Sequence, residues 1–153
     1  MKCLRALADP VMIGNAGNAQ IPGDLDNGAW AAYILADAEL ACHILDSMNS
    51  GDAATLPTAM TMAALALFQR LGFPLPFSAE ANPRDHTGRR FPLLIQGAHT
   101  NSGKFIVQLA RMAGLMVVAS CDDERVHKDA LEALGAHLVV DIVSIPIVLH
   151  LSI

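Results

Sequence analysis

The residues best suited to binding a ligand form a glycine-bracketed loop, GAHTNSG, at positions 97–103. An apolar segment precedes the loop and helix-forming residues follow it, so it is expected to turn a strand into a helix. At such a turn the N–H groups of the first helical turn have no intrahelical partner and form an anion site. The loop therefore predicts a pyrophosphate site, with the candidate contacts Gly97, His99, Thr100, Asn101, Ser102 and Gly103.

A carboxylate at the right distance supports the same chemistry. Asp122 lies nineteen positions after Gly103, just past the apolar run MVVASC. In the dinucleotide-binding fingerprint, an acidic residue about twenty positions on binds the ribose hydroxyls. The loop departs from that fingerprint, because Gly97 and Gly103 are six apart and the middle glycine is missing. An ordinary turn in another α/β fold therefore stays open, as does a solvated helix start for the segment DDERVHKD.

The elements around this loop follow a regular order. Strands are expected at 92–97, 116–120 and 137–141, with a helix between each pair, the second at 123–135. Strand–helix–strand–helix–strand at this spacing is half of a doubly wound parallel sheet, which predicts an α/β, Rossmann-type fold. The residues expected to face inward from the second helix are Val126, Ala130, Ala133 and Leu134.

The first half of the chain is less regular. Residues 1–27 look like loop, and 28–40 favour a β segment. Residues 50–72 are expected to be helical, with Asp52 as a cap and Pro57 marking a break or a new first turn. From residue 58 to 71 this helix is apolar on nearly every face, which predicts burial all round. The proline-rich stretch at 73–90 is expected at the surface.

Composition limits the partners. Of the 153 residues, 53% are hydrophobic and only 16% are charged, against about 25% charged in typical soluble domains. Self-association, an apolar pocket or a larger parent protein would each explain this. The net charge of −5 and the lack of a basic stripe argue against nucleic acid. Three scattered cysteines favour a cytoplasmic location, and the apolar tail at 142–153 is too short to span a membrane.

Four segments resemble the medium-chain dehydrogenase/reductase superfamily, and within it the zinc-free branch of quinone reductases and fungal trans-acting enoyl reductases. AATLPTAMTMAALALFQRLG is similar to the family's EAATLPTAxxTAxxAL helix, and LLIQGAHTNSGKFIVQLARMAG resembles LLVxGGSTATGxxAIQLAKLAG. GAWAAYILAD is similar to GAFAEYV, which closes a catalytic domain, and LEALGAHLVVD is similar to xxSLGAD and its strand. The resemblance covers roughly residues 24–141.

The resemblance implies an NAD(P)H-dependent oxidoreductase, most like an enoyl reductase of secondary metabolism. Its substrate would be the C=C of a polyketide-type acyl thioester, small or bound to an acyl carrier, with a polyketide synthase as a partner. The cofactor contacts would be the loop residues together with Asp122, Asp123 and Arg125. The substrate-facing segment would comprise Thr58, Ala59, Met60, Thr61, Met62 and Leu65. No metal is expected, because the six histidines show neither an HExxH motif nor close pairing.

Two departures from the family matter. His99 stands where a small residue is usual, and Asp122 stands where users of NADPH tend to have serine. The family therefore implies NADPH, while a carboxylate at 122 favours the free 2′-hydroxyl of NADH. Arg125 and Lys128 nearby would partly offset that preference.

Length is a further departure, since family members exceed 300 residues. The expected organisation is a remnant of a GroES-like catalytic domain (1–49), a linking helix and surface loop (50–90), a partial NAD(P)-binding unit (91–141) and an unmatched apolar tail (142–153). The chain is thus interpreted as truncated at both ends. A quinone reductase, or a non-catalytic remnant that at most binds nucleotide, remains an alternative to the enoyl reductase.

Overall fold

The computed structural model describes residues 12–14, 41–79, 82–84 and 88–142. The chain divides into two compact units, Met1–Thr58 and Ala59–Ile153. Each unit is treated by itself below, and the domain limits expected from the sequence remain a prediction.

In the first unit, a short antiparallel pair joins β1 (Met12–Gly14) to β2 (Ala41–His43). The expectation of loop throughout 1–27 is therefore wrong at β1, because its pairing partner comes from much further along the chain. The β segment expected at 28–40 lies outside the described residues. Helix α1 (Ser50–Ala54) follows. Asn49 caps it by accepting a hydrogen bond from the Asp52 N–H at 2.9 Å, so Asp52 is not the cap.

The predicted break at Pro57 is confirmed. Helix α1 ends at Ala54, and α2 (Leu56–Ala64) begins one residue before the proline. A π-helical turn, η3 (Leu65–Arg70), continues it. The expectation of burial on every face is wrong, because only the stripe of Ala59, Ala63 and Leu67 is buried. Four apolar side chains on the other faces are exposed: Met60, Met62, Leu65 and Leu71.

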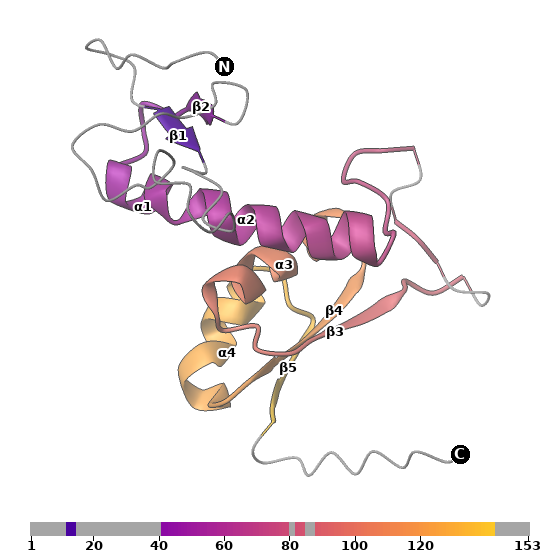
Figure 1. Ribbon diagram of the computed structural model, residues 1–153. Helices are drawn as coiled ribbons and strands as arrows, with labels where there is room; N and C mark the ends of the chain where they lie inside the picture. The colour runs from indigo at the N-terminus through magenta and orange to yellow at the C-terminus, as the bar shows by residue number, and fades with distance from the viewer. Residues whose placement is uncertain (1–11, 15–40, 80–81, 85–87, 143–153) are drawn as a thin grey trace, which may run out of the picture. The chain divides into compact units, whose positions relative to one another are not determined.

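The second unit contains the predicted parallel sheet, in the order β3–β4–β5. Its strands are β3 (Pro92–Ile95), β4 (Met116–Cys121) and β5 (Leu138–Asp141). Helix α3 (Asn101–Met112) connects the first two strands and α4 (Glu124–Ala133) the last two. Both helices lie on the same side of the sheet (Figure 1). The α/β, Rossmann-type fold expected from the sequence is confirmed.

The core lies between this sheet and its helices. Ile95, Ala119 and Val139 are paired across the three strands and are all buried. From α4 the buried side chain is Leu131, while Val126 is 67% exposed and Ala130 and Ala133 are exposed as well. The inward face predicted for α4 is therefore wrong at Val126, Ala130 and Ala133, whereas Leu134 is partly buried and packs against the core as predicted. Small alanines are compatible with either face of a helix, and the large Leu131 decides which face packs.

The opposite face of the sheet is apolar but largely uncovered. Leu94, Val118 and Leu138 are aligned across the three strands, and Leu94 is 62% exposed. Met116, two residues before Val118, points to the same face and is exposed too. Side chains that alternate along parallel strands normally meet helices on both faces. Within the described residues, α3 and α4 cover one face of the sheet, while Leu94, Met116 and Leu138 are exposed on the other.

Opposite the carboxyl ends of the strands, His137 links the sheet to α3. The Val117 N–H donates to His137 Nδ1 at 3.0 Å, and the guanidinium groups of Arg111 and Arg90 lie against Nε2. Partial desolvation, followed by the positive charges of Arg111 and then Arg90, lowers the pKa of His137 from its ordinary value of 6.5. The imidazole is therefore held neutral over a wider pH range than a free histidine.

Candidate functional site

The turn from β3 into α3 is organised by hydrogen bonds within the predicted loop. Gly97 adopts a left-handed backbone, with φ of +68°. The Thr100 hydroxyl donates to the Gly97 carbonyl at 2.8 Å and accepts from the Gly103 N–H at 3.1 Å. Thr100 is thus the N-cap of α3. The Ala98 N–H donates to the Ser120 carbonyl at 2.9 Å, which fixes the turn to the neighbouring strand.

Gly103 allows the helix to approach the strand closely. A Cβ at this position would lie 2.4 Å from the Gly97 carbonyl oxygen and 2.8 Å from the Ala98 Cα. Both are backbone atoms, so no side-chain rotation could relieve the contact. In dinucleotide-binding turns the last glycine of the fingerprint has this role of close helix–strand packing. The spacing of the loop is irregular, yet its two glycines serve the turn and the packing that the fingerprint requires.

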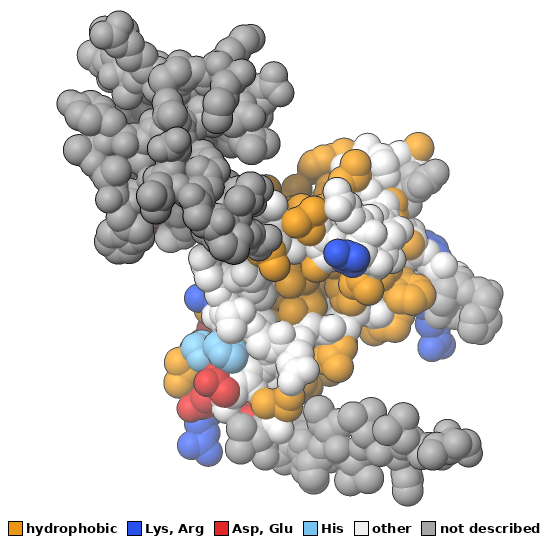
Figure 2. All heavy atoms as spheres, in the orientation of Figure 1, with side chains coloured by type: hydrophobic (Ala, Val, Ile, Leu, Met, Phe, Trp, Pro, Cys, Tyr) orange, Lys and Arg blue, Asp and Glu red, His pale blue; other side chains and the backbone are white. Residues whose placement is uncertain are grey.

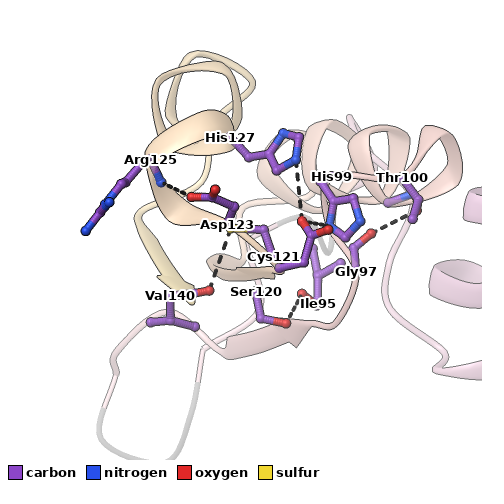
Figure 3. Close-up of polar contacts among 12 residues, drawn as sticks. Ile95, Gly97, His99, Thr100, Ser120, Cys121, Asp123, Arg125, His127 and Val140 are labelled. Atoms are coloured by element: carbon purple, nitrogen blue, oxygen red, sulfur yellow. Dashed lines mark hydrogen bonds and ion pairs between the residues drawn. The ribbon is translucent and has the colours of Figure 1, made fainter. Parts of the chain in front are cut away.

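At the carboxyl ends of β3 and β4, three side chains gather into what we call the His–Asp–His cluster: His99, Asp122 and His127 (Figure 3). His99 Nδ1 lies 3.6 Å from Asp122 Oδ1, and His127 Nε2 lies 3.4 Å from the same oxygen. The two imidazoles stack, with centroids 5.0 Å apart and planes 18° from parallel. Figure 2 shows histidine side chains side by side at one corner, next to acidic side chains. The loop and the predicted ribose carboxylate therefore lie side by side at this edge of the sheet.

His127 was missed by the sequence analysis, which saw no close pairing among the histidines. It lies in the first turn of α4, five residues after Asp122. His99 lies in the loop between β3 and α3, just before the N-cap Thr100. Because parallel strands end at one edge of the sheet, histidines after two neighbouring strands can meet there. That topological argument could have found the pair.

The remaining polar residues after β4 are engaged in the helix itself. Asp123 is the N-cap of α4 and accepts from the Arg125 N–H at 2.9 Å. The Arg125 side chain extends away from the two histidines (Figure 3). Glu124 pairs with Lys128 at 2.7 Å. Asp122, with a side chain 63% exposed, is the acid of this segment that faces the loop.

Beneath the cluster, Cys121 is buried, and its thiol donates to the Val140 carbonyl at 3.8 Å. Burial raises the pKa of Cys121, and the negative charges of Asp122 and Asp141 raise it further. The thiol is therefore protonated at neutral pH and belongs to the packing of the sheet. Ser120 donates to the Ile95 carbonyl at 3.4 Å and joins β4 to β3.

The predicted substrate-facing residues lie on α2 and the start of η3. Ala59 is buried, whereas Met60, Met62 and Leu65 present apolar side chains at the surface. Thr58 and Thr61 each make polar or electrostatic contacts. Within the described residues, no group of three or more His, Cys, Asp or Glu side chains is placed to hold a metal ion. No helix in that part of the chain is long and apolar enough to cross a membrane.

Comparison with known proteins identifies relatives over most of the chain. A trans-enoyl reductase of Aspergillus sclerotiorum is 36% identical over 136 residues, which are 83% of this chain and 35% of the relative. A trans-enoyl reductase of Aspergillus niger is 34% identical over 76% of this chain and 31% of its own length. A zinc-type alcohol dehydrogenase-like protein of Schizosaccharomyces pombe is 34% identical over 84% and 36%. No protein-family model matches the chain.

Solved structures share the fold. The quinone oxidoreductase from Coxiella burnetii superposes with a TM-score of 0.61 at 21% identity, over 90% of this chain and 36% of that one. The CurK enoyl reductase gives a TM-score of 0.54 at 23% identity, over 71% and 28%. The chain spans about a third of the length of the relatives it matches. With its Rossmann-type unit and its fungal reductase relatives, the chain belongs to the medium-chain dehydrogenase/reductase superfamily.

Proposed function

We propose that this chain carries the adenosine- and pyrophosphate-binding part of an NAD(P)H-dependent enoyl reductase. The observation that carries the proposal is the meeting of the GAHTNSG loop with Asp122, at 3.6 Å from His99. Trans-enoyl reductases of two Aspergillus species are among the relatives. The loop supplies the geometry for a dinucleotide, and the relatives supply the class of reaction.

The residues present fit a nicotinamide dinucleotide. The start of α3 offers N–H groups and the positive end of a helix dipole to a pyrophosphate. Gly97 and Gly103 let that backbone come close, while the side chains of His99, Asn101 and Ser102 extend the donor set. Thr100 holds the turn through its capping bonds. Asp122 would accept hydrogen bonds from a ribose, with Asp123 and Arg125 placed by the same helix start.

The cofactor would be NADH at least as readily as NADPH near neutral pH. A carboxylate at position 122 accepts hydrogen bonds from a free 2′-hydroxyl and repels a 2′-phosphate. Of the two residues expected to offset this repulsion, Arg125 turns its side chain away from the His–Asp–His cluster (Figure 3) and Lys128 pairs with Glu124 at 2.7 Å. Asp122→Asn is expected to weaken NADH binding and to weaken NADPH binding less.

When bound, NAD(P)H supplies the hydride that reduces an electron-poor C=C. The residues of this chain hold and orient the adenosine end, and positioning is the main contribution of such a site. The exposed apolar side chains of Met60, Met62 and Leu65 would form part of the wall against an acyl chain. The substrate is then an enoyl thioester of polyketide type, small or carried by an acyl carrier of a polyketide synthase.

Self-association is also expected. The uncovered sheet face presents Leu94, Met116 and Leu138 together, and contiguous exposed apolar side chains favour association. The proposed partner is a second copy of this chain, which is present in any solution of the protein. Leu94→Ser is expected to shift the chain toward the monomer in light scattering, while the exposed Val126→Ser on α4 serves as the matched control.

The test of the proposed function is a thermal melt of the 153-residue chain without ligand, with NADH and with NADPH. A ligand that binds only the folded state raises the melting temperature by mass action. We expect a shift with NADH that Asp122→Asn reduces. Absence of a shift with either cofactor would overturn the proposal. Oxidation of the cofactor on adding an enoyl thioester, and not on adding a quinone, would then assign the reaction.

A further inference from the structure

The two histidines of the His–Asp–His cluster lie close to the same atom, Asp122 Oδ1. His99 reaches Asp122 Oδ1 from the loop after β3, and His127 reaches it from the first turn of α4. Each histidine side chain is mostly buried, while the carboxylate is mostly exposed. The ring stack at 5.0 Å keeps both imidazoles beside the carboxylate. A ribose bound to Asp122 would therefore lie next to two titratable rings.

The charge of this cluster depends on its protons. With both imidazoles neutral the cluster carries one negative charge, one proton neutralises it, and a second makes it positive. An imidazole exists in a neutral and a protonated form, so the sign of the charge on the cluster follows the protonation of its two rings.

Other charges around the cluster are largely committed to partners or directed elsewhere. Asp123 caps α4, and Glu124 pairs with Lys128. The Arg125 side chain points away (Figure 3). The charged groups on the elements packed around the cluster are Lys104 and Arg111 of α3, Asp141 of β5, the α4 cap Asp123, and Glu124, Arg125, Lys128, Asp129 and Glu132 of α4.

We propose that His99 and His127 set the cofactor specificity of this site by reversing the charge around Asp122. NADH is preferred when both imidazoles are neutral, and the relative affinity for NADP(H) rises when they are protonated. The proposal rests on the proposed function, because it assumes that a dinucleotide ribose binds at Asp122. It assigns to the two histidines a role that the spacing of the loop did not predict.

The physical argument is electrostatic. A 2′-phosphate carries two more negative charges, or nearly so, than a 2′-hydroxyl at neutral pH. A neutral histidine pair leaves the Asp122 carboxylate to repel that phosphate and to accept from the hydroxyl. Protonated imidazoles neutralise Asp122 and can themselves donate N–H groups to phosphate oxygens. The same three side chains then favour the opposite cofactor.

The experiment is a pair of calorimetric titrations of the full chain with NAD⁺ and NADP⁺, which survive acid better than the reduced forms. At about pH 8 and at about pH 5.5 the ratio of the two dissociation constants is compared. We expect the relative affinity for NADP⁺ to rise about tenfold at the lower pH, as one unit of charge acting on a nearby phosphate in a solvated site implies. The phosphate itself gains a proton near about pH 6, which works against this rise.

Variants separate the histidines from other titrations. His99→Gln and His127→Gln keep a polar side chain and remove the imidazole. Each is therefore expected to reduce the rise in relative NADP⁺ affinity, and the double variant should keep only the part that the phosphate's own proton causes. His43→Gln, which removes an exposed histidine of the first unit, is the matched control and should leave it unchanged.

The outcomes are distinct. Binding of both cofactors with a ratio independent of pH would overturn the role of the histidines and leave the proposed function standing. A rise in relative NADP⁺ affinity that is as large in the double variant as in the unchanged chain would overturn it as well. No binding of either cofactor at either pH would overturn the proposed function and this inference with it.

Discussion

Replacing Gly103 with alanine is expected to disrupt the turn that carries the site. The added methyl group would lie 2.4 Å from the Gly97 carbonyl oxygen, whereas real Cβ contacts do not fall below 3.0 Å. The backbone must therefore move by about 0.6 Å, the difference between those two distances. Because Ala98, directly after Gly97, is tied to β4 through the Ser120 carbonyl, we expect the movement to fall on the start of α3.

The size of the effect follows from two opposing contributions. Overpacking a tight site costs about 1–3 kcal/mol, while alanine gains up to about 1 kcal/mol over glycine within a helix. A net loss of about 1–2 kcal/mol corresponds to a fall of roughly 5–10 °C in the melting temperature of a unit this small. Cofactor binding should weaken as well, because the displaced N–H groups are those proposed to bind the pyrophosphate.

Circular dichroism melts with and without NADH measure both effects. Gly51→Ala is the matched control, because Gly51 also lies in a first helical turn and its added Cβ would approach a side-chain atom, Asn49 Oδ1, at 3.2 Å. A shift of a few tenths of an ångström relieves this contact and leaves Asn49 as the cap of α1, so little loss is expected. If the Gly103→Ala variant has the same melting temperature as the Gly51→Ala variant and is still stabilised by NADH, the close-packing argument is wrong.

Three further predictions concern the second unit and its chemistry. Leu131→Ala should lower the free energy of unfolding by about 2–5 kcal/mol because the side chain is fully buried, whereas the exposed Val126→Ala should stay within about 0.5 kcal/mol in chemical denaturation. Burial, and then the neighbouring carboxylates, raise the pKa of Cys121. Its thiol should therefore react with a thiol reagent more slowly than that of the exposed Cys42. Equal labelling of the two cysteines in peptide mass spectrometry would contradict this. Folding lowers the pKa of His137 from 6.5. The stability that this shift contributes is therefore complete above pH 6.5 and is lost as the pH falls toward the pKa of the folded state. The free energy of unfolding of His137→Gln should vary less with pH in that window.

The parallel sheet could be predicted because its signals are local. Apolar runs ended by glycine, and helices of the right length between them, are visible at 92–97, 116–120 and 137–141. β1 could not be predicted in this way, since Met12–Gly14 is a strand only through its pairing with Ala41–His43. The local sequence pattern also failed to predict most of the inward face of α4. Alanine is apolar, yet its small side chain tolerates exposure to solvent.

The site could be predicted in part for the same reason. Loop 97–103 and Asp122 are identified by spacing along one chain. His127 is identified only by register: Ile95 pairs with Ala119, so the residues a few positions beyond each emerge at the same edge of the sheet. That pairing brings His99 and Asp122 together and sets His127 beside them. The contact is a property of the sheet and not of either segment.

That difference changes the inference about the cofactor. Asp122 taken alone argues for NADH, because a single carboxylate repels a 2′-phosphate. Asp122 between two stacked imidazoles can be negative, neutral or positive as a group, and the argument from one residue then holds only while both rings are neutral. On the proposed assignment, specificity at this position would be a property of the three side chains together, and substituting His99 or His127 should change cofactor preference even though Asp122 is untouched.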